Sequence, residues 1–335
     1  MIVQALGAWL AVAVAVMPVA VAPAASATPS PGPCTPIPAA KIGFQLATVM
    51  GGFMPPGATP LPSPDPARMR AGTANPPMPR SAPAPADFAR YLKALRKIGF
   101  RRMERFGGTL QLPQEQYARI LREAGIVAVS SHGALEPPEW EAELDRARAL
   151  GQDYVGSWGF GPIGLDSYEK VLATAENLDR LGKTAAARGL RFMVHDHDAA
   201  LRFRYPYDRN GDGRLELTTA WEIIAARTDP MALRFEVDVH WALKGLGDED
   251  ALVRFLIRNR DRIDLLHVKD RTADGAVTDM GRGINNWPRI FAAAGSRIRY
   301  YIWEYERPAD PLRSAAIAYR YLRCMPAPDV STPGS

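Results

Sequence analysis

The sequence has little of several features that would point to a specialised class of protein. It has only two cysteines and five histidines in 335 residues, and its formal net charge is only +5, from 41 Lys and Arg against 36 Asp and Glu. Such a small excess, with basic and acidic residues interspersed, argues against a nucleic-acid-binding protein. No apolar run after residue 25 approaches the length of a membrane span. The content of 47% hydrophobic and 23% charged residues is typical of a globular protein.

The first residues have the composition of an export signal. Residues 5–25 carry no charge and are mostly Ala, Val, Leu and Met, and A-S-A at 25–27 matches a cleavage site followed by Pro- and Ser-rich chain. We predict a signal peptide over 1–27, a linker over 28–40, and an exported mature protein. This protein would be secreted, periplasmic or at the cell surface, without stable membrane insertion. An uncleaved anchor is the alternative, since the run is nearly long enough to span a bilayer.

The rest of the chain alternates eight times between short β-rich runs and longer amphipathic runs. Strands are expected over Ile42–Ala47, Arg101–Phe106, Val127–His132, Tyr154–Trp158, Arg191–His197, Arg234–His240, Ile263–Lys269 and Arg299–Glu306. Helices are expected over Ala86–Ile98, Gln114–Ala124, Glu139–Leu150, Ser167–Arg188, Thr219–Ala226, Glu249–Asn259, Trp287–Ala294 and Leu312–Leu322. This alternation predicts a single-domain (β/α)₈ TIM barrel over 41–324, followed by a tail over 325–335. An open doubly wound sheet is the alternative, although the first turn lacks the glycine-rich dinucleotide fingerprint.

Two loops interrupt this repeat. The first, Gly51–Pro85, follows strand one, is rich in Pro, Ala and Met, and would lie over the active face of a barrel as a lid or a linker. The second follows strand five and matches the first half of an EF-hand loop, with Asp208, Asn210 and Asp212 at positions one, three and five. Position twelve is Thr219 rather than Glu, so this loop predicts either a Ca²⁺ site or a plain turn before a helix.

All five histidines fall at or near the carboxyl ends of predicted strands. They belong to strands three, five, six and seven: His132, His195, His197, His240 and His267. TIM-barrel active sites are built at this face of the barrel. Because histidines with only structural roles would not be expected to gather there, their placement indicates an active site.

Alternation along the strands points a set of charged side chains into the barrel together with the histidines. These are Glu104, Glu236, Asp238, Lys269, Glu304 and Glu306. Burying so many charges is costly unless they pair or bind a cation. Asp238, His267 and Glu304 suit one divalent ion, and their mixed oxygen and nitrogen donors favour Mn²⁺, Zn²⁺, Co²⁺ or Fe²⁺ over Ca²⁺. His195 is the leading fourth ligand and His197 the alternative, and a hydrogen-bonded polar core without metal is the competing interpretation.

The two cysteines, Cys34 and Cys324, are candidates for a disulfide if the protein is exported. Cys34 precedes the first predicted strand and Cys324 follows the last predicted helix. In a closed barrel both positions lie at the bottom face, where the last helix packs beside the first strand. The barrel therefore predicts that the two sulfurs come within bonding range, and two free thiols are the alternative.

Seven segments carry a resemblance to a known family: KIGFQLATV (41–49), ALRKIGFRRMERFGG (94–108), GIVAVSSHG (125–133), GLRFMVHDHD (189–198), TDPMALRFEVDVHWALKG (228–245), RIDLLHVKDR (262–271) and RYYIWEYERPADPL (299–312). Their order and spacing over 41–323 resemble the xylose-isomerase-like TIM-barrel superfamily, the sugar phosphate isomerase/epimerase group. In this family the ion is usually held by a Glu after strand five, an Asp after six, a His after seven and a Glu after eight. Asp238, His267 and Glu304 match the last three. His195 stands where the first Glu is expected, within an H-x-H strand that a subset of the family carries.

The resemblance implies a sugar isomerase or epimerase that uses a divalent metal. Such an enzyme abstracts a proton next to a sugar carbonyl and passes through an enediolate. Glu304 would be both ligand and base, Lys269 would stabilise an oxyanion, and His240 or His132 would donate a proton. Lys269 has the alternative role of an ion-pair partner for Glu304 or Asp238.

The expected substrate is a small carbohydrate, and four residues are expected to bind it: Glu104, Trp158, Trp241 and His197. The tryptophans would stack on a sugar face or, alternatively, pack within the barrel. A keto-glycoside lyase or hydrolase on the same barrel is a competing function, which export favours because free phosphosugars are scarce outside the cytoplasm. A non-catalytic sugar-binding barrel is another. An abasic-site endonuclease shares the fold, but its larger zinc cluster uses more histidines, and the weak charge argues against DNA.

Overall fold

The structure, a computed structural model, describes residues 34–54, 82–108 and 110–325. The predicted signal peptide, the first part of the predicted linker (28–33), most of the loop after strand one and nearly all of the predicted tail lie outside the described residues. Among the helices that the structure describes, none is both long and apolar enough to cross a membrane.

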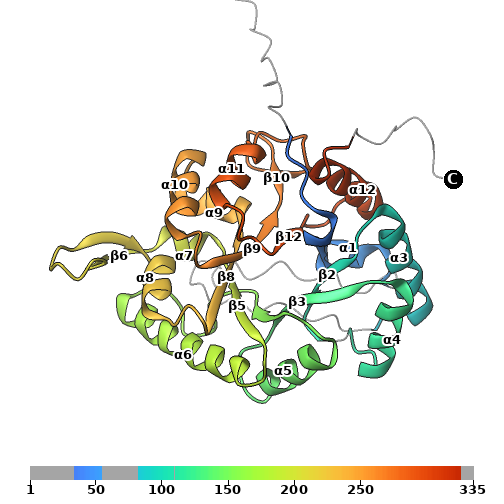
Figure 1. Cartoon of the computed structure of the whole chain (residues 1–335), viewed down its shortest axis with the longest axis horizontal. Helices are drawn as coiled ribbons and strands as arrows, with labels where there is room; N and C mark the ends of the chain where they lie inside the picture. Colours follow the sequence, from blue (N-terminus) through green and yellow to red (C-terminus); the bar gives the residue numbers. More distant parts are fainter. Residues whose placement is uncertain (1–33, 55–81, 109, 326–335) are drawn as a thin grey trace, which may run out of the picture. The chain divides into compact units, whose positions relative to one another are not determined.

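Eight parallel strands form a closed barrel, as the sequence predicts (Figure 1). In their order around the barrel they are β1 (Ile42–Gln45), β12 (Tyr300–Trp303), β9 (Ile263–Val268), β8 (Leu233–Asp238), β5 (Arg191–His195), β4 (Tyr154–Ser157), β3 (Val127–Gly133) and β2 (Arg102–Phe106). The first strand closes the barrel because it pairs on both sides, Gly43 with Arg102 and Ile42 with Tyr301. This closure excludes the open doubly wound sheet.

Helices surround the barrel and bury their apolar faces against it (Figure 1). The eight predicted helices are α3 (Pro85–Ile98), α4 (Gln114–Ala124), α5 (Glu139–Ala149), α6 (Tyr168–Ala186), α8 (Ala220–Arg227), α10 (Glu249–Asn259), α11 (Trp287–Ala294) and α12 (Pro311–Leu322). The helix α4 shows the shared design, because Tyr117 and Leu121 on its inner face are buried. It ends at Gly125, whose φ of 69° is a left-handed conformation that glycine adopts without strain.

Short elements at the carboxyl ends of the strands were not predicted. They are α1 (Leu46–Val49), α7 (Asp198–Arg202), α9 (Val239–Leu246), the 3₁₀ turn Met50–Gly52 and the small hairpin of β10 (Asp270–Arg271) with β11 (Val277–Thr278). A further 3₁₀ turn, Ala39–Lys41, was also not predicted and precedes β1. Six of the eight predicted strands extend one to three residues past the observed carboxyl end, and the last, predicted over Arg299–Glu306, ends at Trp303. The sixth shows why: the carboxylate of Asp238 accepts a hydrogen bond from the Trp241 amide and caps α9, so His240 lies in a helix and not in the strand.

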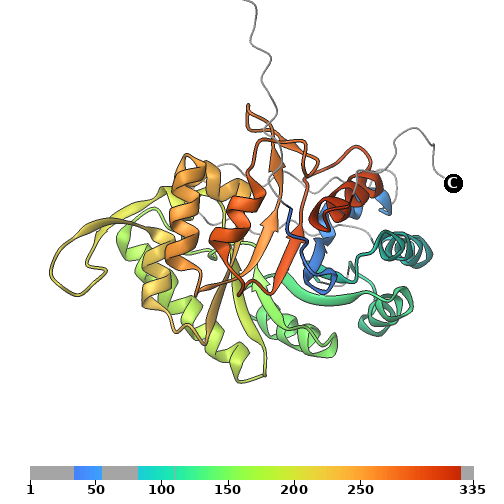
Figure 2. The same ribbon diagram turned by 45° about the horizontal axis from the view of Figure 1, so that its top comes forward.

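The loop after strand five is the tip of an antiparallel hairpin, β6 (Arg204–Tyr207) with β7 (Glu216–Thr219), which the sequence did not predict. Figure 2 shows this hairpin extending away from the barrel wall. At the tip, the carboxylate of Asp208 accepts hydrogen bonds from the amides of Asp212 and Gly213. Thr219 caps α8 through a capping box with Glu222. The Ca²⁺ site with Asp208, Asn210 and Asp212 stays a prediction.

The predicted disulfide is present. Cys34 and Cys324 are bonded, with their Cα atoms 5.9 Å apart, within the usual range for a disulfide. Next to the bond, the Ile37 amide donates to the Leu322 carbonyl at 2.9 Å. The chain before β1 is therefore fastened to the end of α12, the two parts that meet when the barrel closes.

An apolar layer fills the barrel at mid-height. It consists of side chains from five different strands: Val129, Tyr154, Met193, Leu265 and Ile302, all at most 2% exposed. Met193 and Leu265 precede His195 and His267 by two positions, so each shares the inward face of its strand with the histidine. We call this layer the apolar floor, because it separates the carboxyl end of the barrel from the amino end.

Candidate active site at the carboxyl end of the barrel

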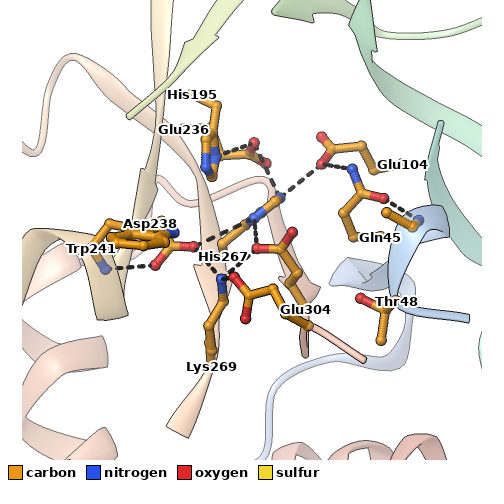
Figure 3. A network of polar contacts seen from close by, with 12 residues as sticks. Gln45, Thr48, Glu104, His195, Glu236, Asp238, Trp241, His267, Lys269 and Glu304 are labelled. Carbon is orange, nitrogen blue, oxygen red and sulfur yellow. Dashed lines mark hydrogen bonds and ion pairs between the residues drawn. The ribbon is translucent and has the colours of Figure 1, made fainter. Parts of the chain in front are cut away.

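Above the apolar floor, three predicted metal ligands converge (Figure 3). Asp238 ends β8, His267 lies in β9 and Glu304 follows β12, and these three strands are neighbours in the barrel. One donor atom from each lies within 4.8 Å of the other two. His267 Nδ1 is 3.0 Å from Glu304 Oε2 and 3.8 Å from Asp238 Oδ2. We call these three residues the outer group.

A second set of donors lies deeper, and His267 belongs to both. This inner group consists of His132, His195, Glu236 and His267, all buried. The Oε2 atom of Glu236 lies 2.8 Å from His132 Nε2, 3.1 Å from His195 Nδ1 and 3.2 Å from His267 Nε2. His195, the expected fourth ligand of the ion, thus lies against Glu236, which the sequence analysis placed inside the barrel but did not assign to the site.

Lys269 links the carboxylates of the outer group. Its buried ammonium lies 2.7 Å from Glu304 Oε2 and 3.0 Å from Asp238 Oδ2, and it also contacts Glu306. Lys269 therefore is the ion-pair partner of both predicted ligands, which was one of its two expected roles. It sits close enough to the site to stabilise negative charge there as well.

Glu104 lies beneath the histidines. It is fully buried, and its Oε1 is 2.7 Å from His267 Nε2 while its Oε2 accepts from Ser130 at 2.7 Å. The amide of Gln45 lies 3.4 Å from both Glu104 Oε1 and His132 Nδ1. This position favours a supporting role for Glu104 over the substrate contact expected from the sequence. Gln45 was missed, although a polar residue at an inward position of strand one was a usable signal.

Asp196 was also missed, and it fixes the backbone at the end of β8. It is fully buried, and its Oδ1 accepts from the Asp238 amide at 2.7 Å. Asp238 Oδ1 in turn accepts from the Trp241 amide at 2.9 Å, which leaves Oδ2 facing Lys269 and His267. The two hydrogen bonds hold the Asp238 carboxylate in its orientation toward the other ligands.

Partly exposed aromatic residues form the rim of the site. The Trp158 indole donates to His197 Nε2 at 2.6 Å, and the His197 ring lies 5.5 Å from that of Trp158 and 5.3 Å from that of Trp241. His240, displaced onto α9, packs against Trp241 with ring centroids 5.3 Å apart. Three of the residues expected to bind substrate, Trp158, His197 and Trp241, therefore lie in contact at the rim, with His240, an expected proton donor, beside Trp241.

The charges of the site shift several pKa values in opposite directions. Burial lowers the pKa of His195 to about 4, and the nearby charge of His267 adds to this effect. For His267 burial also favours the neutral ring, but the carboxylates of Glu236, Glu304 and Glu104 outweigh it and raise the pKa well above its usual value. Burial alone would raise the pKa of Glu304, but Lys269 and His267 hold it well below the usual range. Glu304 is thus ionised at neutral pH.

The donor atoms fit a divalent cation. The outer group offers two carboxylates and one imidazole, a donor set typical of Mn²⁺, Zn²⁺, Co²⁺ or Fe²⁺ sites. Among the described residues, the buried Glu236 Oε1 lacks a hydrogen-bond donor, a situation that buried carboxylates normally avoid, and Asp238 Oδ2 has the Lys269 ammonium as an ion-pair partner but makes no hydrogen bond. Ligand atoms with free electron pairs therefore face one another at the centre of the site.

A closed (β/α)₈ barrel with carboxylates and histidines gathered at the carboxyl ends of its strands has the layout of a metal-dependent TIM-barrel enzyme. The chain belongs to the xylose isomerase-like TIM barrel family, whose model matches residues 92–323. No curated protein is significantly similar to it in sequence.

Solved structures share the fold at low sequence identity. A sugar phosphate isomerase/epimerase from Parabacteroides distasonis is 20% identical, with a TM-score of 0.61 over 86% of this chain and 95% of that one. A D-allulose 3-epimerase from Methylomonas sp. is 13% identical, with a TM-score of 0.56 over 85% and 97%. A xylose isomerase-like TIM barrel protein from Mycobacterium smegmatis, solved in complex with magnesium, is 14% identical, with a TM-score of 0.54 over 85% and 95%. At these identities the likeness establishes the fold.

Proposed function

We propose that this protein is a carbohydrate isomerase or epimerase that moves a proton next to a sugar carbonyl with the help of a divalent cation. The observation that carries the proposal is the convergence of Asp238, His267 and Glu304 donor atoms within 4.8 Å of one another. The family and the fold shared with the D-allulose 3-epimerase support the same class of reaction.

The outer group would hold the cation, with His195 as the proposed fourth ligand on the adjacent strand β5. A divalent cation bound there polarises a carbonyl oxygen and stabilises negative charge on it. The magnesium complex of the M. smegmatis barrel supports binding of a divalent cation by a protein of this fold. The Asp196 carboxylate, which accepts from the Asp238 amide, and the Glu104 carboxylate, which contacts the His267 ring, would orient Asp238 and His267 toward the cation.

Glu304 would take the proton from the carbon next to the carbonyl. It is ionised, partly exposed to the mouth and 2.7 Å from Lys269, whose ammonium would stabilise the enediolate oxygen. Return of the proton to the neighbouring carbon gives an isomer, and its return to the opposite face of the same carbon gives an epimer. His240 at the rim, or His132 below it, would supply that proton.

The rim would bind the sugar. Trp158 and Trp241 present partly exposed rings on either side of His197, and such rings stack on the apolar face of a pyranose. The hydrogen bond from Trp158 fixes the His197 ring between them.

A keto-glycoside lyase or hydrolase is the second candidate, because the same proton abstraction can expel a glycosidic leaving group. The Cys34–Cys324 disulfide favours it, since disulfides persist in exported proteins, outside the compartment where free phosphosugars are abundant. We propose export on the same ground, together with the predicted signal peptide.

The test is proton exchange in D₂O, followed by NMR, on a panel of aldoses, ketoses and 3-keto-glycosides. We expect deuterium to enter the carbon next to the carbonyl, and Glu304→Gln to slow this exchange about 10²-fold or more. Glu141→Gln, an exposed substitution on α5, is the matched control and should leave the rate unchanged. Product mass separates the candidates, because an isomerase conserves it and a lyase does not. Sugar binding without exchange would instead support a non-catalytic barrel.

A further inference from the structure

The amino end of the barrel holds a pocket that the proposed function does not use. Its volume is about 730 Å³, and six basic side chains line it: Lys41, Arg102, Arg191, Arg234, Arg297 and Arg299. A single acidic residue, Asp264, lines it as well. We call this cavity the lower pocket.

The basic residues meet there because of their places in the strands. Arg102 and Arg191 are the first residues of β2 and β5, and Arg299 immediately precedes β12. Arg234 is the second residue of β8, and Lys41 immediately precedes β1. The starts of parallel strands lie together at one end of a barrel, so five separate parts of the sequence bring a cation to the same cavity.

The acidic residue of the pocket is already engaged. Asp264 Oδ1 pairs with Arg234 at 2.5 Å, and its Oδ2 accepts from the Tyr154 hydroxyl at 2.7 Å. Among the described residues, no carboxylate lies within ion-pair distance of Arg102, Arg297 or Arg299. At the carboxyl end, by contrast, Asp238, Glu304 and Glu306 all face Lys269. The lower pocket therefore has an excess of positive charge without counter-charge from the protein.

The apolar floor separates this pocket from the candidate active site. Tyr154, Met193, Leu265 and Ile302 fill the barrel between the two ends and are fully buried. A molecule in the lower pocket could not reach Asp238 or the other residues of the outer group. The pocket is therefore a separate site and not an extension of the substrate position.

We propose that the lower pocket binds a small molecule carrying two or more phosphate groups. Guanidinium groups donate paired hydrogen bonds that match phosphate oxygens, and several of them around one cavity suit a multiply charged anion. The volume lies within the range of about 300–1,000 Å³ typical of small-molecule sites. Binding of such an anion offsets the mutual repulsion of Arg102, Arg297 and Arg299.

The experiment is calorimetric titration of the purified protein with inorganic pyrophosphate at constant ionic strength, with orthophosphate as the singly phosphorylated comparison. The test variant is Arg102→Ala/Arg299→Ala, which removes two guanidinium groups of the pocket. The matched control is Arg254→Ala/Arg282→Ala, which removes two exposed arginines that do not line it. Circular dichroism establishes that each variant is folded.

We expect the wild-type protein to bind pyrophosphate more tightly than orthophosphate. The pocket variant should bind pyrophosphate at least about tenfold more weakly, because each charge-assisted hydrogen bond contributes measurably to affinity, and the control should bind as the wild type does. Absence of pyrophosphate binding by the wild type would overturn the proposal. An unchanged affinity in the pocket variant would also overturn the proposal. So would an equal loss of affinity in the control, because it would show that pyrophosphate is attracted by the overall charge of the protein and not by the pocket.

Discussion

The two ends of the barrel differ in whether their charged side chains are paired with groups of opposite charge. At the carboxyl end, carboxylates, imidazoles and one ammonium are buried together and nearly all contact a group of opposite sign. At the amino end, six cations line a cavity, and within the described part of the chain only Arg234 has a carboxylate within ion-pair distance. The same strands supply both ends: β2 carries Arg102 and then Glu104, and β8 carries Arg234, then Glu236 and Asp238. Inward positions of the same strand thus contribute carboxylates to the paired network above the apolar floor and basic side chains to the lower pocket beneath it.

The largest expected effect comes from breaking the charge balance of the carboxyl end. Lys269→Met leaves the carboxylates of Asp238, Glu304 and Glu306 without their shared ammonium. We expect a loss of about 3–5 kcal/mol in the free energy of unfolding of the metal-free protein, since an uncompensated buried charge is costly. Urea unfolding in EDTA measures it, with the exposed Lys93→Met on α3 as control. A loss below about 1 kcal/mol would show that the network does not depend on the lysine.

The second prediction is that the disulfide affects the stability of the protein but not the reaction at the carboxyl end of the barrel. Cys34→Ser/Cys324→Ser removes the bond between the chain before β1 and the end of α12. We expect a loss of about 2–4 kcal/mol in unfolding free energy, because the bond constrains a long loop in the unfolded chain. The rate of proton exchange below the melting transition should not change. A large fall in that rate would contradict the separation of the two regions.

The third prediction concerns a buried carboxylate outside both ends. Burial alone would raise the pKa of Glu222, but Arg209 and Arg258 outweigh it and lower the value to about 2. Because the pKa of Glu222 is lower in the folded state than in the unfolded chain, its ionised form stabilises the fold above pH 4–5. The protein loses this stabilisation as the pH falls toward about 2. The contribution is on the order of 2 kcal/mol.

Unfolding of wild type and Glu222→Gln at pH 6 and pH 3 measures this contribution. The difference in unfolding free energy between the two proteins should shrink at the lower pH. Glu216→Gln, an exposed change on β7 just before α8, should show no such convergence. A pH-independent difference for Glu222→Gln would mean that packing, rather than ion pairing, is responsible.

The smallest expected effect is at the amino end. Arg299→Ala removes a cation that has no ion-pair partner among the described residues and that lies beside like charges. We expect the unfolding free energy to change by no more than about 0.5 kcal/mol, or to increase slightly at low salt. A loss above about 1.5 kcal/mol, measured by urea unfolding at low and high salt, would show that the lower pocket is a structural feature and would weaken the contrast between the two ends.

The fold could be predicted from the sequence because its signals are local and repeated. Apolar alternation identified all eight barrel strands, and the closed barrel placed Cys34 and Cys324 together. The ends of the strands could not be predicted in the same way. Asp238 looks like the next inward residue of a strand, yet its side chain caps a helix, a choice that depends on its contact with the Trp241 amide. The polar hairpin Arg204–Thr219 has too weak an alternation to identify.

The site was predictable in composition but not in its pairing. Strand alternation predicts that Asp238, His267 and Glu304 point inward, and the structure brings donor atoms of all three together, although Glu304 follows β12 rather than lying in it. Which imidazole faces which carboxylate depends on the tilt and stagger of strands around the barrel, and this information is not local. His195 therefore lies against Glu236, a pairing that no pattern in the sequence indicates.

The central claim, a divalent cation held by the outer group, is tested most directly by metal analysis. The purified protein is loaded with Mn²⁺ or Zn²⁺, dialysed and analysed by mass spectrometry for metal per chain, alongside Asp238→Ala and His132→Ala. We predict about one tightly held ion per wild-type chain, its loss in Asp238→Ala and its retention in His132→Ala, since metal affinity follows the ligands that contact the ion. No bound metal in the wild type, or retention in Asp238→Ala with loss in His132→Ala, would contradict the account.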